Sequence, residues 1–178
     1  MSDMPRFAFC IFARFNFFKM CIKTADLCDE HIDKLQVAEN IFRDFGGRKT
    51  FTGEIFTVKV FEDNSLVRTS LEADGTGKIL VVDGGGSQRC ALVGGLIGQL
   101  AKKNNWSGII VFGCIRDSEE ISGIDVGVKA ISTCPVKSVK RGEGQTNILV
   151  RFAGVNFIPG HFLYADEDGI VVSEKALH

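Results

Sequence analysis

The sequence contains few of the residues that usually build metal clusters. Its 178 residues include three histidines, far apart, and six cysteines that form no CxxC pair: Cys10, Cys21, Cys28, Cys90, Cys114 and Cys134. This pattern argues against a zinc site. Scattered cysteines in a chain of this length are typical of reduced, buried thiols, so we expect an intracellular and cytoplasmic protein.

An excess of basic charge and a long apolar run are also missing. Twenty-one lysines and arginines stand against twenty-two acidic residues, which gives a net charge of −1, and no basic tract stands out. We therefore expect no direct contact with nucleic acid. Because no apolar run is long enough to cross a bilayer, we expect no membrane span. A hydrophobic content of 45% fits one domain with a sizeable core.

The stretch from Lys78 to Asp117 has the clearest organisation. Two short runs rich in β-branched residues, Ile79–Val82 and Ile109–Phe112, predict buried strands. A helical pattern lies between them over Leu96–Asn105, with one apolar face formed by Leu96, Ile97, Leu100 and Ala101. Together they predict a βαβ unit, in which two parallel strands lie side by side.

Each of these two strands is followed by a polar loop. The first loop is Asp83–Ser87 and the second is Gly113–Asp117. Because the C-terminal ends of parallel strands meet at one edge of a sheet, we expect both loops to open into one crevice. We place the active site in that crevice.

The flanking segments are mostly strand-like. Strands are predicted over Phe51–Phe61, Val126–Ser132, Asn147–Phe152, Phe162–Ala165 and Ile170–Ser173, and helices over Thr24–Asp33, Val37–Phe45, Leu66–Ala73 and Ser118–Ile121. Gly46-Gly47 is expected to end the second of these helices, and Asp166–Gly169 to form a hairpin turn of the Asp-Gly type. This distribution predicts an α+β fold, a layered β/β/α domain rather than a doubly wound sheet.

The first 23 residues differ in composition from the rest. They contain six phenylalanines and four basic residues against Asp3 as the only acid. A basic, acid-poor, apolar segment is typical of organelle targeting. The alternative is an extra helix or strand that packs on the domain or on a neighbouring subunit. We therefore divide the chain into an N-terminal extension, residues 1–23, and a single domain, residues 24–178.

The glycine loop fits none of the common nucleotide-binding motifs. Gly84-Gly85-Gly86 is followed by Ser87-Gln88-Arg89, so the GxGxxG pattern lacks its last glycine. The P-loop pattern fails because no Gly-Lys-Ser/Thr follows. A methyl-donor site lacks a supporting acid at a later strand end. A tight reversal after a strand is the simpler interpretation of these glycines.

The chain resembles the RraA-like family in four runs that occur in the family's order: LVVDGGGSQRCALVGG, NNWSGIIVFGCIRD, VKSVKRGEGQ and LYADEDGIVVS. The resemblance covers residues 24–174. The family includes regulators of ribonuclease E activity and divalent-metal-dependent 4-hydroxy-4-methyl-2-oxoglutarate aldolases. It implies a β/β/α domain of the swivelling type, assembled as a homotrimer or a dimer of trimers with the active site at a subunit interface.

The resemblance also assigns roles to two segments. In aldolase-type members the pair that matches Arg116-Asp117 binds the substrate through the arginine and Mg²⁺ or Mn²⁺ through the aspartate. Backbone groups of the segment that matches Gly94, Gly95, Leu96 and Ile97 hold the substrate as well. Gly95 departs from the pattern, because many active members have an aspartate there that orients a water or assists proton transfer. We therefore expect Gly95→Asp to raise aldol cleavage.

The residue types support these roles independently. Cleavage of a 2-oxo acid to pyruvate needs a clamp for a carboxylate and a positive centre beside the enolate oxygen. Arg116 offers a planar, bidentate fork, and Asp117 suffices as a ligand for Mg²⁺, which keeps several waters. Gly94 and Gly95 would expose N–H groups at a helix start. The competing interpretation is an ordinary ion pair between Arg116 and Asp117 on a loop.

Weaker candidates surround this pair. Asp83 either caps the glycine turn that follows it or reaches the hydration shell of the metal. Arg89 either contacts a second substrate carboxylate or pairs on the surface. Structural or solvated roles are expected for Glu143, Cys114, His31 and His161, since no histidine lies near Cys114 in the sequence to activate it.

The sequence therefore predicts a divalent-metal-dependent lyase that forms pyruvate from small 2-oxo acids, by aldol cleavage or by oxaloacetate decarboxylation. The alternative is a non-enzymatic regulator whose partner is a ribonuclease, which it binds and inhibits. Arg116-Asp117 favours the enzyme, whereas Gly95 favours the regulator or a reduced activity.

Overall fold

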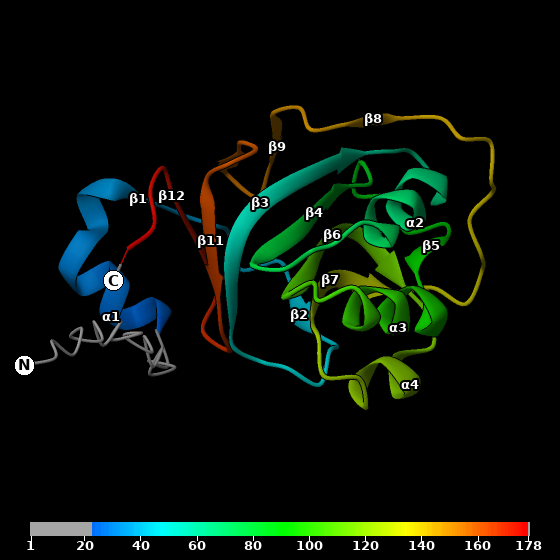
Figure 1. The fold of residues 1–178 in the computed structure, drawn as a ribbon, viewed down its shortest axis with the longest axis horizontal. Helices are drawn as coiled ribbons and strands as arrows, with labels where there is room; N and C mark the ends of the chain where they lie inside the picture. Colours follow the sequence, from blue (N-terminus) through cyan, green and yellow to red (C-terminus); the bar gives the residue numbers. More distant parts are fainter. Residues whose placement is uncertain (1–22, 178) are drawn as a thin grey trace, which may run out of the picture.

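One large mixed sheet dominates the computed structural model, which describes residues 23–177 (Figure 1). Its strands follow the order β1-β12-β11-β3-β4-β6-β7-β2, with β5 beside β6 and β8 beside β3. Their bounds are β1 Leu35–Val37, β2 Arg43–Asp44, β3 Phe51–Lys59, β4 Lys78–Asp83, β5 Ala91–Val93, β6 Gly108–Ile115, β7 Gly127–Thr133, β8 Gln145–Thr146, β11 Phe162–Ala165 and β12 Ile170–Ser173. Strands β9 (Val150–Phe152) and β10 (Val155–Phe157) form a separate hairpin.

The centre of the sheet is parallel and apolar. Strand β3 pairs with β4, β4 with β6 and β6 with β7, all in parallel. Helix α3 (Gly95–Lys103) lies between β4 and β6 in the chain, so the predicted βαβ unit is confirmed. Every residue of β4 after Lys78 is buried, as expected for a strand that is covered on both faces.

The two faces of the sheet are covered by different layers. Leu80 and Val82 of β4 pack in one core with residues of α3 and of α2 (Ser65–Glu72). The alternate residues Ile79 and Val81 pack in a second core with the β9–β10 hairpin. Figure 1 shows α2 and α3 together on one side of the sheet. The predicted α+β fold with β/β/α layers is therefore confirmed.

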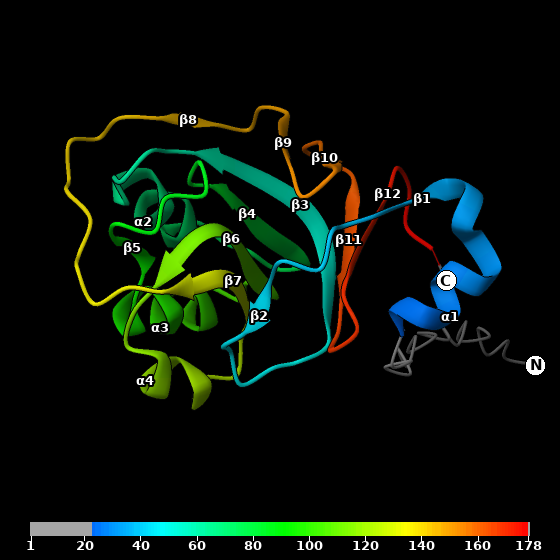
Figure 2. The same cartoon turned by 180° about the vertical axis from the view of Figure 1, so that it is seen from behind.

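Helix α1 (Thr24–His31) closes one end of the molecule beside β1 and β12, as Figures 1 and 2 show from opposite sides. A 3-10 turn over Ile32–Lys34 follows it, so the predicted helix over Thr24–Asp33 is confirmed except for its end. Leu27 is buried against β11 and β12. The Thr24 N–H and hydroxyl each donate to Asp166 at 2.7 Å, which fixes the start of the helix.

The predicted helix over Val37–Phe45 is wrong. This segment contains the end of β1, a bend and β2, and it crosses from one edge of the sheet to the other. Gly46 and Gly47 do not cap a helix. A Cβ on either glycine would collide with the backbone between Ile124 and Val128. Close passage against β7 and pairing with distant strands override the helical pattern here.

Three smaller details also differ from the prediction. Gly113–Ile115 belongs to β6 and not to a loop, and the strand expected over Asn147–Phe152 begins only at Val150. Leu96 is 75% exposed, although its helical spacing predicted burial. The predicted hairpin turn over Asp166–Gly169 is confirmed, as a four-residue loop in which the Asp166 carboxylate accepts the N–H groups of Asp168 and Gly169.

The N-terminal extension of residues 1–23 lies outside the described residues except for Lys23, so neither interpretation of it is tested. Within residues 23–177, none of the helices has the length and apolar character needed to cross a membrane.

Candidate functional site

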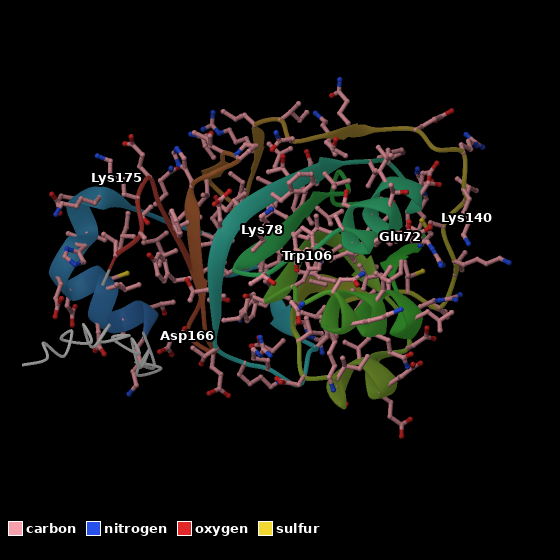
Figure 3. All side chains as sticks on the ribbon, in the orientation of Figure 1. Glu72, Lys78, Trp106, Lys140, Asp166 and Lys175 are labelled. Atoms are coloured by element: carbon pink, nitrogen blue, oxygen red, sulfur yellow. The ribbon has the colours of Figure 1, made fainter. Side chains whose placement is uncertain are left out.

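A small cavity with several charged side chains in its wall lies where β5 and β6 end and α3 begins. Its volume is about 130 Å³. Its walls come from four segments and consist of Asn64, Arg68, Ala91, Gly94, Leu96, Ile97, Arg116, Asp117, Lys137, Ser138 and Lys140. Figure 3 labels Lys140 on the connection between β7 and β8, at the end of the molecule away from α1. The structure therefore brings Arg116 and Asp117 together with three of the four predicted backbone positions, and Gly95 adjoins them.

The pair Arg116-Asp117 follows an irregular strand end. The pairing register of β6 shifts against both β5 and β7 near this point. Asp117 has φ 55° and ψ 42°, in the left-handed region that residues other than glycine rarely adopt. Bulges and strained residues of this kind are common beside functional sites. The irregularity turns the chain from β6 toward the start of α3.

A hydrogen bond from α3 holds the Asp117 side chain. Asp117 Oδ2 accepts the Gly95 N–H at 3.1 Å and lies 3.5 Å from Arg116 Nε. The N–H groups of Ile97 and Gly98 both donate to the Gly94 carbonyl. The backbone donors predicted to hold a substrate are thus partly engaged, because the Asp117 carboxylate holds the Gly95 N–H and the Gly94 carbonyl holds the Ile97 N–H.

The cavity has an excess of positive charge. Within residues 23–177, four cationic side chains line it (Arg68, Arg116, Lys137 and Lys140) against the single carboxylate of Asp117. The side chains of Arg116 and Asp117 are 39% and 43% exposed, so their ion pair is open to a ligand. This charge distribution favours an anion with carboxylate groups.

A buried carboxylate that the sequence analysis missed holds the β7–β8 connection over the cavity. Asp63 is 1% exposed. It accepts the N–H groups of Ser65 at 2.7 Å, Arg141 at 2.6 Å and Glu143 at 3.3 Å. Burial alone would raise the pKa of Asp63, but hydrogen bonds from the Ser65 hydroxyl and from these N–H groups outweigh it and hold the pKa well below its usual value.

Part of the role of Asp63 has a sequence signal. Asp63 stands two residues before Ser65 in a turn, which is the spacing of an Asx turn. Its other partners, Arg141 and Glu143, lie 78 and 80 residues away in the chain, and no local pattern indicates them.

The expectation of one crevice shared by both loops is wrong. The loop Asp83–Ser87 lines a different cavity of about 620 Å³, together with Phe61, Phe112 and Arg151. No residue of that loop lines the cavity of Asp117. Beyond Phe112, β5 replaces β4 as the partner of β6. The glycine turn is therefore left outside the strand end that carries Arg116.

The open alternatives for Asp83 and Arg89 resolve to structural roles. Asp83 Oδ1 accepts the Gly85 N–H at 3.0 Å, so this carboxylate caps the glycine turn. Arg89 pairs with Glu62 at 2.6 Å near the surface. Neither side chain lines the cavity that contains Asp117.

The remaining candidates lie away from the cavity or are unreactive. Cys114 is fully buried, and burial raises the pKa of its thiol, which argues against a nucleophile. Cys28, Cys90, Cys114 and Cys134 are all free thiols. Glu143 is exposed, as expected. Neither His31 nor His161 lines the cavity.

Among the described residues, the lining of the cavity offers a metal ion one carboxylate rather than a closed cage of ligands. Within the described residues, no group of three or more His, Cys, Asp or Glu side chains converges to hold a metal ion. Asp117 is the one carboxylate among the described residues of the lining, and it is exposed enough to reach a cation. Mg²⁺ or Mn²⁺ fits such a site, because each keeps several waters and needs few protein ligands.

The fold and the cavity define a known class of α+β domain. The family model described as Aldolase/RraA matches residues 24–172, so the chain belongs to the RraA-like family. The chain is 57% identical over 158 residues to an Aromatoleum aromaticum protein named "Putative 4-hydroxy-4-methyl-2-oxoglutarate aldolase", with 89% of this chain and 99% of the relative covered. A Dechloromonas aromatica protein of the same name is 56% identical over 162 residues, with the same coverage.

Two solved structures share the fold closely. A Geobacillus kaustophilus protein named as S-adenosylmethionine: 2-dimethylmenaquinone methyltransferase superposes with a TM-score of 0.86 and 52% identity, covering 88% of this chain and 97% of that one. The RNA-processing inhibitor RraA from Thermus thermophilis gives a TM-score of 0.85 and 41% identity, covering 88% and 95%. Because these names describe different activities, the fold alone does not decide the function.

Proposed function

We propose that this protein is a divalent-metal-dependent lyase that forms pyruvate from small 2-oxo acids, by cleaving 4-hydroxy-4-methyl-2-oxoglutarate or by decarboxylating oxaloacetate. One observation supports this proposal most directly. Arg116, Asp117 and the start of α3 lie together in one cavity whose charged side chains are mainly cationic. The names of the relatives at 57% and 56% identity agree with the aldolase part of the proposal.

Different residues of the cavity bind different groups of the substrate. Arg116 binds the carboxylate beside the 2-oxo group through its planar fork. The Gly95 N–H is held by Asp117, so we assign the neighbouring N–H of Leu96 to the substrate, at the positive end of α3. Lys137 and Lys140 add positive charge for a further carboxylate.

Asp117 is the residue that we assign to the metal. Its Oδ2 is hydrogen-bonded to Gly95, so Oδ1 is the oxygen proposed for the cation. A bound Mg²⁺ or Mn²⁺ ion supplies a Lewis acid that polarises the 2-oxo group and stabilises the enolate charge. The protein contributes by placing Arg116 and the start of α3 where one substrate reaches both of them.

We also propose that the protein is a homotrimer or a dimer of trimers. The cavity of one chain is small, and Arg116 and Asp117 remain about two-fifths exposed. A neighbouring subunit would complete the wall of the site. Sedimentation or light scattering at micromolar concentration checks this proposal, and a stable monomer would reject it.

The test of the lyase is pyruvate release from 4-hydroxy-4-methyl-2-oxoglutarate, followed with coupled lactate dehydrogenase. We expect pyruvate with Mg²⁺ or Mn²⁺, loss of the reaction after EDTA, and recovery when the metal is restored in excess. Full activity in EDTA would reject the metal. Absence of pyruvate from both this substrate and oxaloacetate would reject the lyase.

The second candidate function is inhibition of an RNA-processing enzyme. The likeness to the Thermus inhibitor, with a TM-score of 0.85, favours it. Adding the protein to a ribonuclease E cleavage assay tests this candidate. Inhibition that persists in Asp117→Asn would support a regulator that works without the cavity, whereas uninhibited cleavage at micromolar protein would reject it.

A further inference from the structure

A carboxylate from another element occupies the side-chain position of residue 95. Gly95 begins α3, and a Cβ built on it would overlap the carboxylate of Glu120 on α4 (Ser118–Ser122). The Gly95 N–H donates to Asp117. Residue 95 is therefore flanked by two carboxylates, with Asp117 at its N–H and Glu120 where its own side chain would be.

Contacts between α3 and α4 fix Glu120 in this place. Gln99 Nε2 donates to Glu120 Oε1 at 2.6 Å. The next residue, Ile121, is fully buried in the core that includes α3. Gly98 allows the close approach, because a Cβ there would lie 3.1 Å from Ile124 Cδ1. The oxygen that comes nearest to the residue-95 side-chain position is Oε2, and Gln99 holds the other one.

The position of Glu120, and not the backbone conformation, explains why residue 95 has no side chain. Gly95 is absent from the residues with positive φ in the described chain, and its conformation is helical. An L-residue is therefore compatible with the backbone, and only the carboxylate end of the Glu120 side chain stands in its way. In the sequence alone, Gly95 stands for a missing acid, whereas in the structure an acid reaches that point from α4.

We infer that Glu120 is the acid–base group of the aldol cleavage, in place of the side chain that Gly95 lacks. This inference rests on the lyase proposed above. Glu120 is exposed and does not line the cavity. The proton therefore passes through one water between Glu120 Oε2 and the substrate hydroxyl, a separation that general acid–base catalysis tolerates.

The aldol cleavage needs no reactant other than the substrate. The C4 hydroxyl of 4-hydroxy-4-methyl-2-oxoglutarate gives its proton through the water to Glu120, and the O–H electron pair forms a new C=O bond. The C3–C4 bond breaks, and its electron pair moves toward the C2 carbonyl to give the enolate of pyruvate. Glu120 returns the proton to C3, so two pyruvate molecules result. Decarboxylation of oxaloacetate has no hydroxyl to deprotonate and does not need Glu120 for bond cleavage.

The first test exchanges the carboxylate between the two positions. The variants are Glu120→Ala, Glu120→Gln, Gly95→Asp and the double variant Gly95→Asp/Glu120→Ala, with Glu119→Ala on the same helix as the control. Both Glu120 substitutions should lower kcat/KM for aldol cleavage by about 10²-fold or more, while oxaloacetate decarboxylation stays near the control. The double variant should recover about tenfold or more of the loss. Gly95→Asp alone brings two carboxylates together, so it should not accelerate cleavage, in contrast to the increase expected from the sequence.

Two kinetic outcomes would overturn the inference: unchanged aldol cleavage in both Glu120 variants, or equal losses in aldol cleavage and decarboxylation. A double variant that is no faster than Glu120→Ala would also contradict the exchange. Glu120→Gln keeps the size of the side chain and can still accept a hydrogen bond from Gln99, so its folding does not confuse the comparison.

The second test measures Mn²⁺ affinity by electron paramagnetic resonance and needs no turnover. Removing a carboxylate beside the metal ligand should weaken Mn²⁺ binding by on the order of tenfold, and the double variant should restore it. If the Glu120 substitutions weaken Mn²⁺ binding, the double variant restores it, and the wild type forms no pyruvate, then the lyase is rejected. The position of Glu120 beside the metal ligand is supported in that case. A wild type that forms pyruvate while all Glu120 variants match Glu119→Ala in both tests would reject the role of Glu120 alone. If the wild type neither binds Mn²⁺ nor forms pyruvate, both the lyase and the role of Glu120 are rejected.

Discussion

The Gly95 N–H donates to Oδ2 of Asp117 across 3.1 Å and 22 residues of chain. This bond joins the start of α3 to the loop after β6, and it fixes a side chain whose backbone is already in the left-handed region. A fixed carboxylate in a cavity lined by cationic side chains is preorganised for the metal-binding role that we propose for Asp117.

Arg116→Lys should weaken substrate binding although it keeps the charge. Lysine cannot reproduce the planar fork that holds a carboxylate with two hydrogen bonds. The loss of one charge-assisted bond, about 1.5–3 kcal/mol, corresponds to about 10–100-fold in kcat/KM for oxaloacetate. Arg48→Lys is the control, because Arg48 pairs with Asp125 outside the cavity lining. Equal effects of the two substitutions would contradict a specific role for Arg116.

Asp63→Asn should loosen the β7–β8 connection over the cavity. The amide places N–H groups against the N–H donors of Arg141 and Glu143, at a cost of about 1.5–3 kcal/mol for a lost bond to a charged group. Hydrogen exchange at residues 139–144 should become faster. Asp74→Asn, at an exposed turn, is the control. Unchanged exchange in this segment would show that Asp63 does not hold it.

Asp166 should give the fold an acid-sensitive contribution. Burial by itself raises its pKa, but hydrogen bonds from Thr24, Asp168 and Gly169 outweigh burial and lower it. Because the folded-state pKa lies below the unfolded one, the contribution is complete above about pH 4 and is lost as the pH falls further. Denaturant titrations from pH 6 to pH 2 should show a shallower acid decline in Asp166→Asn. An identical decline in both proteins would contradict this.

Gly75→Ala should destabilise the domain, because a Cβ there would overlap the ring of Trp106. Trp106 is the only tryptophan of the chain, is buried, and donates to the Ala73 carbonyl at 3.1 Å. Overpacking of this kind costs about 1–3 kcal/mol, and the fluorescence of Trp106 reports the unfolding. Gly169→Ala, where the added Cβ meets nothing within 4 Å, is the control. Equal midpoints for the two variants would contradict the packing.

The central βαβ unit could be predicted because its information is local. The β-branched runs around Ile79 and Ile109 are continuous, and burial on both faces follows from that pattern. The true structure of residues 37–45, where a helix was predicted, could not be found from local information. Its residues pair with β12 and β7 at the two edges of the sheet, and these partners lie far away in the sequence.

The candidate site also has contacts that could be predicted from the sequence and contacts that could not. The meeting of Arg116 and Asp117 with Gly94 followed from strand order and from the resemblance. The contacts of Asp63 with Arg141 and of Glu120 with residue 95 depend on how loops from distant parts of the chain pack together. No spacing in the sequence indicates such contacts. They are also the contacts that give the site its shape.

The central claim is tested most directly by pyruvate formation from oxaloacetate, measured for the wild type and for Asp117→Asn with Mg²⁺ and after EDTA. The rate with Mg²⁺ but without protein is subtracted, because the free ion also decarboxylates oxaloacetate. Asp29→Asn, an exposed residue of α1, is the control. We predict a rate for the wild type that disappears with EDTA, and for Asp117→Asn a folded protein at the protein-free rate. A wild-type rate in Asp117→Asn, or no wild-type rate above the protein-free one, would contradict the account.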